Sequence, residues 1–264
     1  EKVKNIPEYQ LRHNKKENTL ILKAAEIEQH ASDFLQEYSK FNSDYSLSTP
    51  QATPIEDIIE NYCGIITDYQ TFDDSNILGM TAFSSGLINI KRDDEITPYR
   101  IEKGTIVISN ELAEDENQEG RFLYTLAHEF GHNFYHRVLF ETPDNSNQPS
   151  LFDDEPGETQ VISCHRDNIE NIDLTHNKDW TEWQADYFAS CILMPREAVA
   201  KFWEPYIKEP DFVFGETQKA LLSHMSWMEI EYHIGEFIKK FNVSYQAARI
   251  RLEKLNYIER RKRL

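Results

Sequence analysis

The sequence predicts an α+β fold that is mostly helical and contains a small β-sheet. Stretches with apolar residues every three or four positions, a pattern typical of surface helices, occupy both ends of the chain. Short extended runs rich in Ile, Val and Thr are close together between them. With 264 residues, the chain is long enough to bury a substantial core in one large domain or two small ones.

An N-terminal helical extension and a linker are expected over residues 1–54. The polar residues 1–17 are expected to be loosely ordered. A stripe of apolar side chains from Thr19 to about Phe41 predicts a helix, and the segment 42–54, rich in Ser, Thr and Pro, is typical of a linker.

The small sheet is expected to follow this linker. Residues 55–62 indicate a short helix, and the extended runs 64–69, 78–90 and 104–109 are expected to pair with one another. The next apolar stripe predicts a helix over residues 119–139.

An acidic segment interrupts this pattern over residues 141–180. It contains ten Asp or Glu against one Arg and one Lys, with Pro, Gly, Asn and Ser interspersed. We expect a mostly irregular insert at the surface, and a segment of this length inside a domain is either functional or mobile. A strongly apolar helix is predicted after it, over residues 181–193.

The C-terminal residues 216–264 are expected to form a unit that resembles a helix-turn-helix. Residues 234–258 indicate a first helix that ends at Lys240 and a second that begins after Ser244, a good N-cap. Residues 231–264 hold nine Lys or Arg and four Asp or Glu, so this end of the chain is basic. Direct contact with DNA is open to such a unit, but packing against the rest of the chain or recognition of a protein is the favoured role.

The overall composition argues against several classes of protein. A net charge of −18, from 28 Lys or Arg and 46 Asp or Glu, disfavours the whole molecule as a nonspecific nucleic-acid binder. Three cysteines are too few for a disulfide framework and fit a reducing cytosol. No apolar run approaches the ~20 residues of a membrane helix, and the first residues lack a signal-peptide core. We therefore expect a soluble, cytoplasmic protein without membrane contact.

The motif that carries chemistry is HEFGH at residues 128–132. His128 and His132 are one helical turn apart, so both imidazoles can reach one ion. Zn²⁺ in catalytic sites takes three nitrogen or oxygen ligands and leaves one position to water. Glu129 is placed to take a proton from that water rather than to bind the metal. An ordinary polar cluster is the alternative interpretation, which the apolar residues around the motif disfavour.

A third ligand must come from elsewhere in the chain. His136 lies on the same face, but about 12 Å along the axis from His128, which is too far for one ion on a straight helix. Glu182 and Asp186, one turn apart on the next predicted helix, offer a carboxylate ligand and an acceptor that fixes the tautomer of a ligand histidine. The pair could also be a solvated face, although beside apolar neighbours it would be costly without a cation.

The cysteines offer a weaker candidate. Cys164 and His165 could form another ligand pair, or Cys164 could act as an inhibitory thiolate, but their place in the acidic segment disfavours both interpretations. Cys63 and Cys191 are expected to pack as small apolar residues.

Together the motifs resemble the ImmA/IrrE family of zinc-dependent, gluzincin-like metallopeptidases, which are regulators in bacteria and phages. HEFGH is followed by E-x-x-A-D-x-F-A at 182–189 and by ILMP at 192–195, and the resemblance covers roughly residues 55–256. It implies a zincin-like, mostly helical metallopeptidase domain over residues 55–215. The chain departs from the family in the longer spacing that the acidic insert creates between the two motifs.

The resemblance also implies roles for single residues. One Zn²⁺ ion would be bound by His128, His132 and Glu182, with Glu129 as the catalytic base, and the natural substrate would be a transcriptional repressor. Residues near enough in sequence to contact substrate or stabilise an oxyanion are Tyr124, Tyr135, His136 and Tyr187.

The leading hypothesis is a cytoplasmic zinc endopeptidase that cleaves a regulatory protein bound in extended form along the edge of the small sheet. The acidic excess is expected to attract the basic DNA-binding surface of such a repressor. Two alternatives remain open: a DNA-binding transcriptional regulator with a structural or vestigial metal site, and a zinc hydrolase that acts on small molecules.

Overall fold

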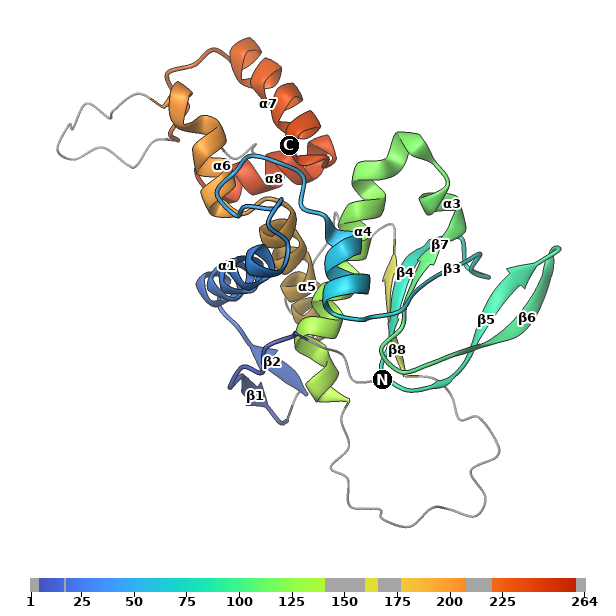
Figure 1. Ribbon diagram of the computed structural model, residues 1–264. Helices are drawn as coiled ribbons and strands as arrows, with labels where there is room; N and C mark the ends of the chain where they lie inside the picture. Colours follow the sequence, from blue (N-terminus) through green and yellow to red (C-terminus); the bar gives the residue numbers. More distant parts are fainter. Residues whose placement is uncertain (1–4, 17, 141–159, 166–176, 208–219, 260–264) are drawn as a thin grey trace.

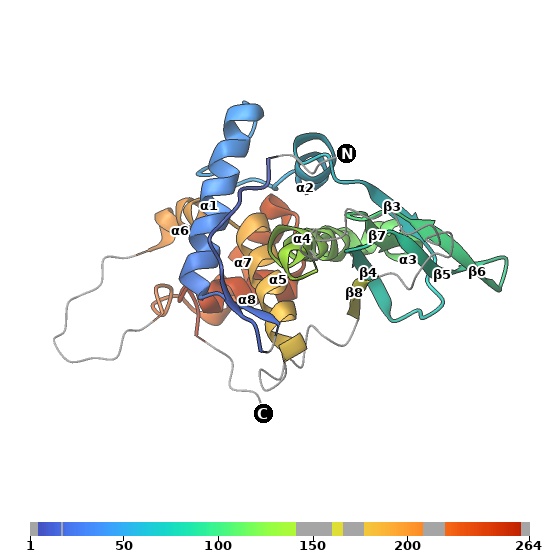
Figure 2. The same cartoon turned by 90° about the horizontal axis from the view of Figure 1, so that it is seen from below.

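The computed structural model of the chain describes residues 5–16, 18–140, 160–165, 177–207 and 220–259. A small β-sheet packs on one side of the long helix α4 (Glu119–Tyr135), and further helices cover its other side (Figure 1). Seen from below, the strands of this sheet lie to one side of α4, and α5 (Asn177–Leu193) and α1 (Ala24–Phe41) lie to the other (Figure 2). This arrangement confirms the predicted α+β class.

The N-terminal segment has more structure than its sequence predicts. The strands β1 (Arg12–Asn14) and β2 (Thr19–Ile21) form an antiparallel pair. The prediction of a loosely ordered start that leads directly into a helix is therefore wrong for the described residues. The helix α1 begins only after Lys23, whose backbone N–H donates to the carboxylate of Glu26 at 2.7 Å and so closes the first turn.

Four strands form the mixed sheet beside α4. They are β3 (Thr67–Gln70), β4 (Ile77–Ala82), β7 (Ile106–Ser109) and β8 (Val161–His165). Their order is β3-β7-β4-β8, with β3 parallel to β7 and the other neighbours antiparallel. The strand β8 adds regular structure to a segment predicted to be mostly irregular, since β-branched Val161 and Ile162 favour a strand where β4 offers an edge. The rest of that segment, residues 141–159 and 166–176, lies outside the described residues.

A hairpin projects from this sheet (Figure 1). The strand β5 (Gly86–Arg92) pairs with β6 (Glu95–Ile101) through a turn at Asp93 and Asp94, both of which have positive φ. The predicted extended run 78–90 therefore breaks between β4 and β5. The expectation that the whole run joins one small sheet is wrong, because β5 pairs with β6, a segment that was not predicted as a strand and that contains Pro98.

The predicted helices over residues 55–62, 119–139 and 181–193 are confirmed, and α5 begins four residues earlier than expected. Residues 55–62 form a helical turn followed by a π-turn, and 136–139 continue α4 as a 3-10 turn. The short segments are α2 (Ile55–Asp57), η1 (Ile58–Tyr62), α3 (Asn110–Ala113), η2 (Glu116–Gln118), η3 (His136–Leu139), α6 (Arg196–Trp203) and η4 (Glu204–Tyr206).

Two helices end the described chain, α7 (Trp227–Phe241) and α8 (Tyr245–Lys254). The turn between them places Asn242 in the left-handed region, with φ 51°. The hydroxyl of Ser244 accepts the backbone N–H of Ala247 at 3.1 Å, so this residue is the N-cap of α8 as expected. Two helices and a turn thus occupy the predicted place, and their assignment as a helix-turn-helix stays a prediction.

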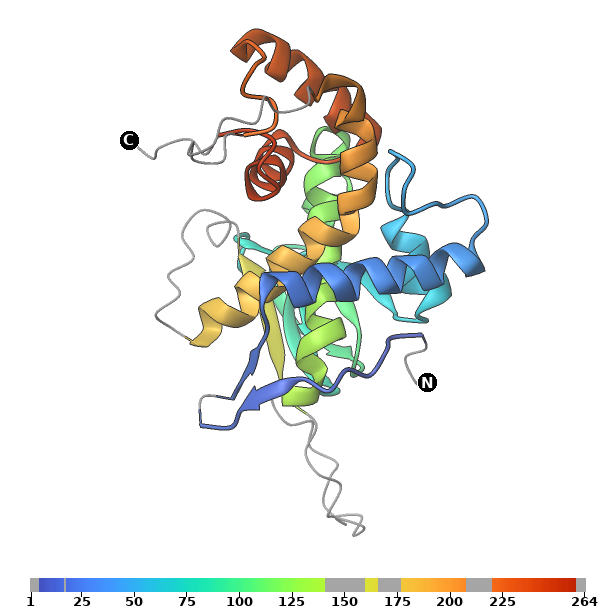
Figure 3. The ribbon, with the colours of Figure 1, turned by 90° about the vertical axis from the view of Figure 1, so that its left-hand side faces the viewer.

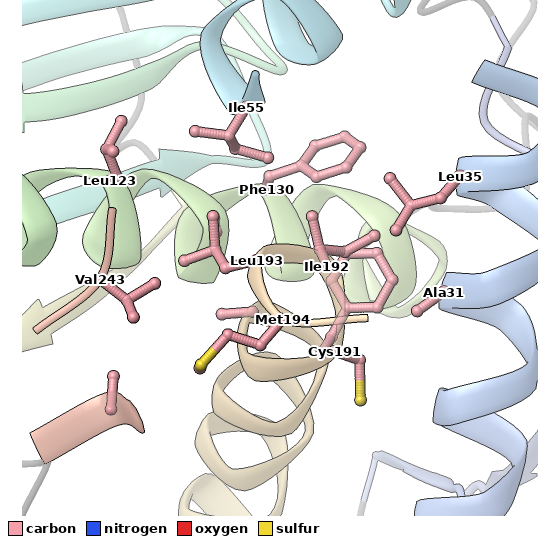
Figure 4. Packing of buried hydrophobic residues seen from close by; sticks show 14 of the residues in the cluster. Ala31, Leu35, Ile55, Leu123, Phe130, Cys191, Ile192, Leu193, Met194 and Val243 are labelled. Carbon is pink, nitrogen blue, oxygen red and sulfur yellow. The ribbon is translucent and has the colours of Figure 1, made fainter. Parts of the chain in front are cut away.

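One hydrophobic cluster joins the helices from both ends of the chain. α1 crosses over α5 and α4 (Figure 3), and Leu35, Phe130 and Ile192 meet where the three helices pack (Figure 4). Phe237 of α7 and Leu252 of α8 are buried in the same cluster. The predicted division of the chain into 1–54, 55–215 and 216–264 stays a prediction. No helix among the described residues has both the length and the apolar character to cross a membrane.

Candidate metal centre

The helix α4 presents three polar residues to the interior. His128, Glu129 and His132 expose only 2%, 0% and 0% of their surface, because the sheet packs on one side of the helix and α5 on the other. The two histidines are one turn apart and their Nε2 atoms lie 3.0 Å from each other. Both imidazoles therefore point to one place, as the spacing in HEFGH predicts.

The helix α5 brings a carboxylate to the same place. Glu182 is 3% exposed, its Oε2 lies 3.3 Å from Nε2 of His128, and its Oε1 lies 3.6 Å from Nε2 of His132. The glycine of HEFGH makes this approach possible. A Cβ on Gly131 would come within 3.1 Å of the Cα of Ala185, so a larger side chain would push α5 away from α4.

The three side chains fit a metal ion. Ligand atoms 2.0–2.2 Å from a tetrahedral Zn²⁺ lie roughly 3.3–3.6 Å from one another. Here the two Nε2 atoms are 3.0 Å apart, and the Glu182 oxygen nearest to each of them lies at 3.3 Å for His128 and 3.6 Å for His132. Neither oxygen of Glu182 has a hydrogen-bond partner among the described atoms. Two imidazole nitrogens and a carboxylate that converge without donors make a site for a cation.

The two histidines are held from behind by other side chains. Nδ1 of His128 lies 2.9 Å from Oδ1 of Asp186, the residue expected to play this part. Nδ1 of His132 lies 2.9 Å from Nδ1 of His136, and Nε2 of His136 lies 3.0 Å from Oε1 of Gln184. With each Nδ1–H donating outward, both Nε2 atoms keep their lone pairs for the shared point.

The charges around the site favour a cation at this point. Burial alone would lower the pKa of His128, but its interactions with Cys164, Asp186 and Glu182 outweigh this effect and raise the pKa well above the ordinary value. Burial lowers the pKa of His136 to about 4, which keeps this ring neutral and able to accept the hydrogen bond from His132.

Glu129 is oriented by the sheet. Its Oε2 accepts the hydroxyl of Thr81 on β4 at 2.7 Å, while its Oε1 has no partner among the described atoms. A Cβ on Gly79 of the same strand would lie 3.0 Å from Cγ of Glu129, so this glycine makes the room that the side chain fills. Burial raises the pKa of Glu129 to about 8, which suits a group that takes up and returns a proton.

The predicted substrate-contact residues lie in different surroundings. The hydroxyl of Tyr124 donates to the backbone oxygen of Asp186 at 3.1 Å, next to the site. The hydroxyls of Tyr135 and Tyr187 pair with His30 and Glu28 of α1. His136 is fully buried, and its Nδ1 lies 2.9 Å from Nδ1 of His132, so it supports that ring from behind.

Several residues of the site gave no signal in the sequence. Thr81 and Gly79 lie in an ordinary strand pattern, and their role depends on which helix packs over them. Gln184 is a polar residue within an apolar helix, and its side-chain amide also donates to the backbone oxygen of Leu20 at 2.8 Å. Its position between Glu182 and Asp186 in a strongly apolar helix is the sequence feature that could have indicated a role in the site.

The comparisons with known proteins agree with the geometry. A family model described as IrrE N-terminal-like domain, of the M78 peptidases, matches residues 158–253. The matched range contains Glu182 and Asp186 and runs to α8, while HEFGH precedes it. No curated protein gives a significant match to the chain. The match, which covers a little over a third of the chain, supports the resemblance to the ImmA/IrrE family found in the two motifs.

Proposed function

We propose that this protein is a cytoplasmic zinc endopeptidase that cleaves a regulatory protein. One observation carries the proposal: two imidazole nitrogens and both oxygens of Glu182 converge within 3.0–3.6 Å in a buried place without any donor among the described atoms. Without a metal ion, only a protonated His128 would lie near the buried charge of Glu182, and neither carboxylate oxygen would have a hydrogen-bond partner among the described atoms, which is unfavourable in a buried place. The match to a peptidase family supports the reaction class.

Zinc is the metal that the donor set favours. Two neutral imidazoles and one carboxylate are typical of catalytic zinc sites, which keep one position for water, whereas Mg²⁺ and Ca²⁺ prefer oxygen ligands alone. When bound, such an ion lowers the pKa of a water molecule and polarises a carbonyl group. The ligands in this proposal are His128, His132 and Glu182, with Asp186 and His136 fixing the two rings.

Glu129 is the proposed general base and acid. Thr81 holds one of its oxygens and leaves the other directed to the site, so the carboxylate accepts a proton from the attacking water and returns it to the departing amine. Tyr124, Tyr135, His136 and Tyr187 were the sequence candidates for contact with substrate. Tyr124 is the favoured one because its hydroxyl lies beside Asp186.

The substrate is proposed to be a protein, and specifically a repressor with a basic DNA-binding surface. The strand next to the site at the edge of the sheet is β8, so an extended substrate would pair there through backbone hydrogen bonds. The net charge of −18 favours a basic partner.

The C-terminal helices are proposed to support the catalytic core or to recognise protein, rather than to read DNA. Arg251 of α8 is fully buried and donates to Glu28 of α1, and Arg249 is paired with Glu231. These two cations are engaged within the fold, which argues against the alternative of a DNA-binding regulator. Salt-dependent, sequence-selective DNA binding without proteolysis would favour that alternative.

The decisive experiment compares wild type with Glu129→Gln on repressor-like proteins encoded near its gene, with and without chelator. We expect cleavage by wild type, its loss in chelator and its recovery on adding Zn²⁺. Glu129→Gln should keep one zinc per chain, measured by elemental analysis, and lose cleavage by a factor of 10² or more, as expected for loss of a general base. Full cleavage by Glu129→Gln would refute the assigned mechanism, and unchanged cleavage in chelator would refute the metal.

A further inference from the structure

A recess with a volume of about 840 Å³ lies at the C-terminal end of α4. Its walls come from the N-terminal segment, from the residues before β3 and β7, from the end of β4, and from the last turn of α4 with η3. Buried apolar side chains line it, among them Ile65, Phe83 and Phe134. This volume is typical of ligand sites, which combine apolar walls with a few placed polar groups.

Asn133 gives the recess a buried polar group without a partner. The residue is 3% exposed, and its Nδ2 has no hydrogen-bond partner among the described atoms. A buried amide that lacks a partner destabilises the fold, and Asn is a weak helix former in the middle of an apolar helix. Neither packing nor helix propensity therefore favours Asn133 here, whereas a ligand that carries an acceptor would satisfy it.

Two cations line the recess among the described residues. Arg137 follows Asn133 by four positions, so the two side chains lie on the same side of the helix and its 3-10 continuation. Arg137 is half-buried and Lys103 is exposed, and neither forms an ion pair with another described residue. An amide N–H and a planar guanidinium one turn apart suit the two oxygens of a carboxylate.

The acids of the recess do not cancel these charges. Glu102 already accepts the hydroxyl of Ser85 at 2.8 Å with one oxygen and Nε of Arg100 at 3.3 Å with the other. Glu8 is exposed, so water and salt screen its charge. The groups of the recess that still need a partner are therefore mainly donors.

The recess is close to the proposed catalytic base. Asn133 comes four residues after Glu129 on α4, about 6 Å along the axis at 1.5 Å per residue, and on the same face of the helix. Ala82, which lines the recess, directly follows Thr81, the residue that donates to Glu129.

We propose that this recess binds an acidic side chain of the substrate that is flanked by apolar residues. This inference rests on the proposed function and adds a sequence preference to it. The carboxylate accepts from Nδ2 of Asn133 and from the guanidinium of Arg137, and the flanking side chains pack on Phe83 and Phe134. Since an extended residue spans about 3.3 Å, the acidic residue lies two or three positions from the scissile bond.

This preference agrees with a partner that is basic as a whole. The net charge of −18 acts at long range and speeds the encounter with a basic protein. The recess acts at short range on one side chain, and so fixes which peptide bond of that protein reaches the proposed base.

The test uses a mixture of blocked hexapeptides and the full-length protein with Glu129→Gln, which should retain peptides without cleaving them. One central position of each peptide is Glu or Gln in equal amounts, and the other positions are Leu, Phe, Val or Ala. Mass spectrometry counts the peptides retained on the immobilised protein. We expect Glu to be enriched over Gln at least tenfold, as charge-assisted hydrogen bonds to two donors imply.

Variants in the same background locate the contact. Arg137→Gln and Asn133→Leu should each lose most of the enrichment, whereas Arg121→Gln, which removes a cation of α4 outside the recess, should keep it. Asn133→Leu removes an unpaired amide at similar volume, so its midpoint in urea without peptide should be no lower than that of the background protein. A lower midpoint together with unchanged enrichment would overturn the binding role of Asn133.

The outcomes separate this inference from the proposed function, because retention is measured with zinc and in chelator. Equal retention of Glu and Gln peptides by protein that holds zinc would overturn the recess and leave the metal centre intact. A Glu preference that both variants abolish would support the recess even if the protein bound no zinc. A thermal shift with 4-phenylbutanoate that Arg137→Gln abolishes, without retention of either class of peptide, would overturn the substrate assignment in favour of a free organic acid.

Discussion

Two mostly buried carboxylates, one on α1 and one on α5, differ in the hydrogen-bond donors that surround them. Glu28 of α1, whose side chain is 12% exposed, receives Nη1 and Nη2 of Arg251 at 2.6 and 3.0 Å and the hydroxyl of Tyr187 at 3.1 Å. Glu182, whose side chain is 4% exposed, has no donor among the described atoms and faces two imidazole nitrogens instead.

The difference shows that the chain supplies its own counter-charge for one of the two carboxylates, Glu28. Arg251 is fully buried and also donates to the backbone oxygen of Met194 at 3.0 Å, so the site around Glu28 is closed and its charges are balanced. Around Glu182 the described atoms include two imidazole nitrogens, and none of them donates a hydrogen bond to the carboxylate. Since a buried carboxylate without hydrogen-bond donors is destabilising, the proposed metal ion is what would complete this second site.

The largest effect is expected from the cation at Glu182. Zn²⁺ at about a thousand times its Kd should stabilise wild type by about 4 kcal/mol, measured by urea denaturation with and without chelator. Glu182→Gln should lose most of this gain and, without metal, should be as stable as wild type or more so, because a buried charge is gone. The control Glu37→Gln, at an exposed position of α1, should keep the full response to zinc. A full response in Glu182→Gln would remove the contrast with Glu28.

Removing the partner of Glu28 should come next. Arg251→Met leaves a mostly buried carboxylate unpaired and should lower the free energy of unfolding by about 3 kcal/mol, the low end for buried pairs because Glu28 keeps some exposure. The double variant Glu28→Gln/Arg251→Met should recover part of the loss. Lys239→Met, which removes an exposed cation of α7, is the control and should change little. If the single and double variants were equally unstable, the pair would not be coupled.

A smaller effect is expected behind the metal ligands. Asp186→Ala removes the acceptor that orients His128 and should weaken zinc binding 10- to 100-fold, or about 1.4–2.7 kcal/mol. Asp186→Asn keeps an oxygen acceptor and should lose less. Competition with a chromophoric chelator measures both affinities. Equal affinity of Asp186→Ala and wild type would mean that the 2.9 Å contact does not position the ring.

The smallest effect concerns acid stability. Burial alone would raise the pKa of Glu28, but the hydrogen bonds and charge of Arg251 outweigh it and lower this pKa below its ordinary value of 4.5. The stabilisation is therefore present above pH 4.5 and is lost as the pH falls through the lowered pKa, at about 1.4 kcal/mol for each unit of depression. Wild type should lose stability more steeply than Glu28→Gln in this acid range, as followed by urea denaturation. If the free energies of unfolding of wild type and Glu28→Gln changed in parallel with pH, the interactions of Glu28 with its partners would not stabilise the fold.

The parts of the site that are local in sequence could be predicted. Spacing within one helix fixes the relation of His128 to His132, and a second spacing of four relates Glu182 to Asp186. The helices that carry both pairs were predicted for the same reason. Gly131 lies within the motif, but its role depends on a distant contact, since the backbone of Ala185 on α5 packs against it.

The parts that depend on distant pairing could not be predicted. The strand β8 forms because the edge of β4 is available, and nothing in the composition of the acidic segment indicates that edge. Thr81 gains its role because α4 lies across β4, and Arg251 because α1 lies beside α8. Cys164 was disfavoured as a ligand on the acidity of its neighbours in sequence, whereas its neighbours in space are His128 and Glu129.

The pair of Glu28 and Arg251 also sets an order of events during synthesis. Glu28 leaves the ribosome 223 residues before its partner, an interval on the order of 10–45 s at roughly 5–20 residues per second. The helix that carries HEFGH and the residue Glu182 are made within that interval. A growing chain therefore contains its proposed metal ligands before Arg251 is available to neutralise Glu28. If the proposed metal is bound, the nascent protein can take up its ion before α8 docks on α1, and this docking then closes a molecule that already holds the ion.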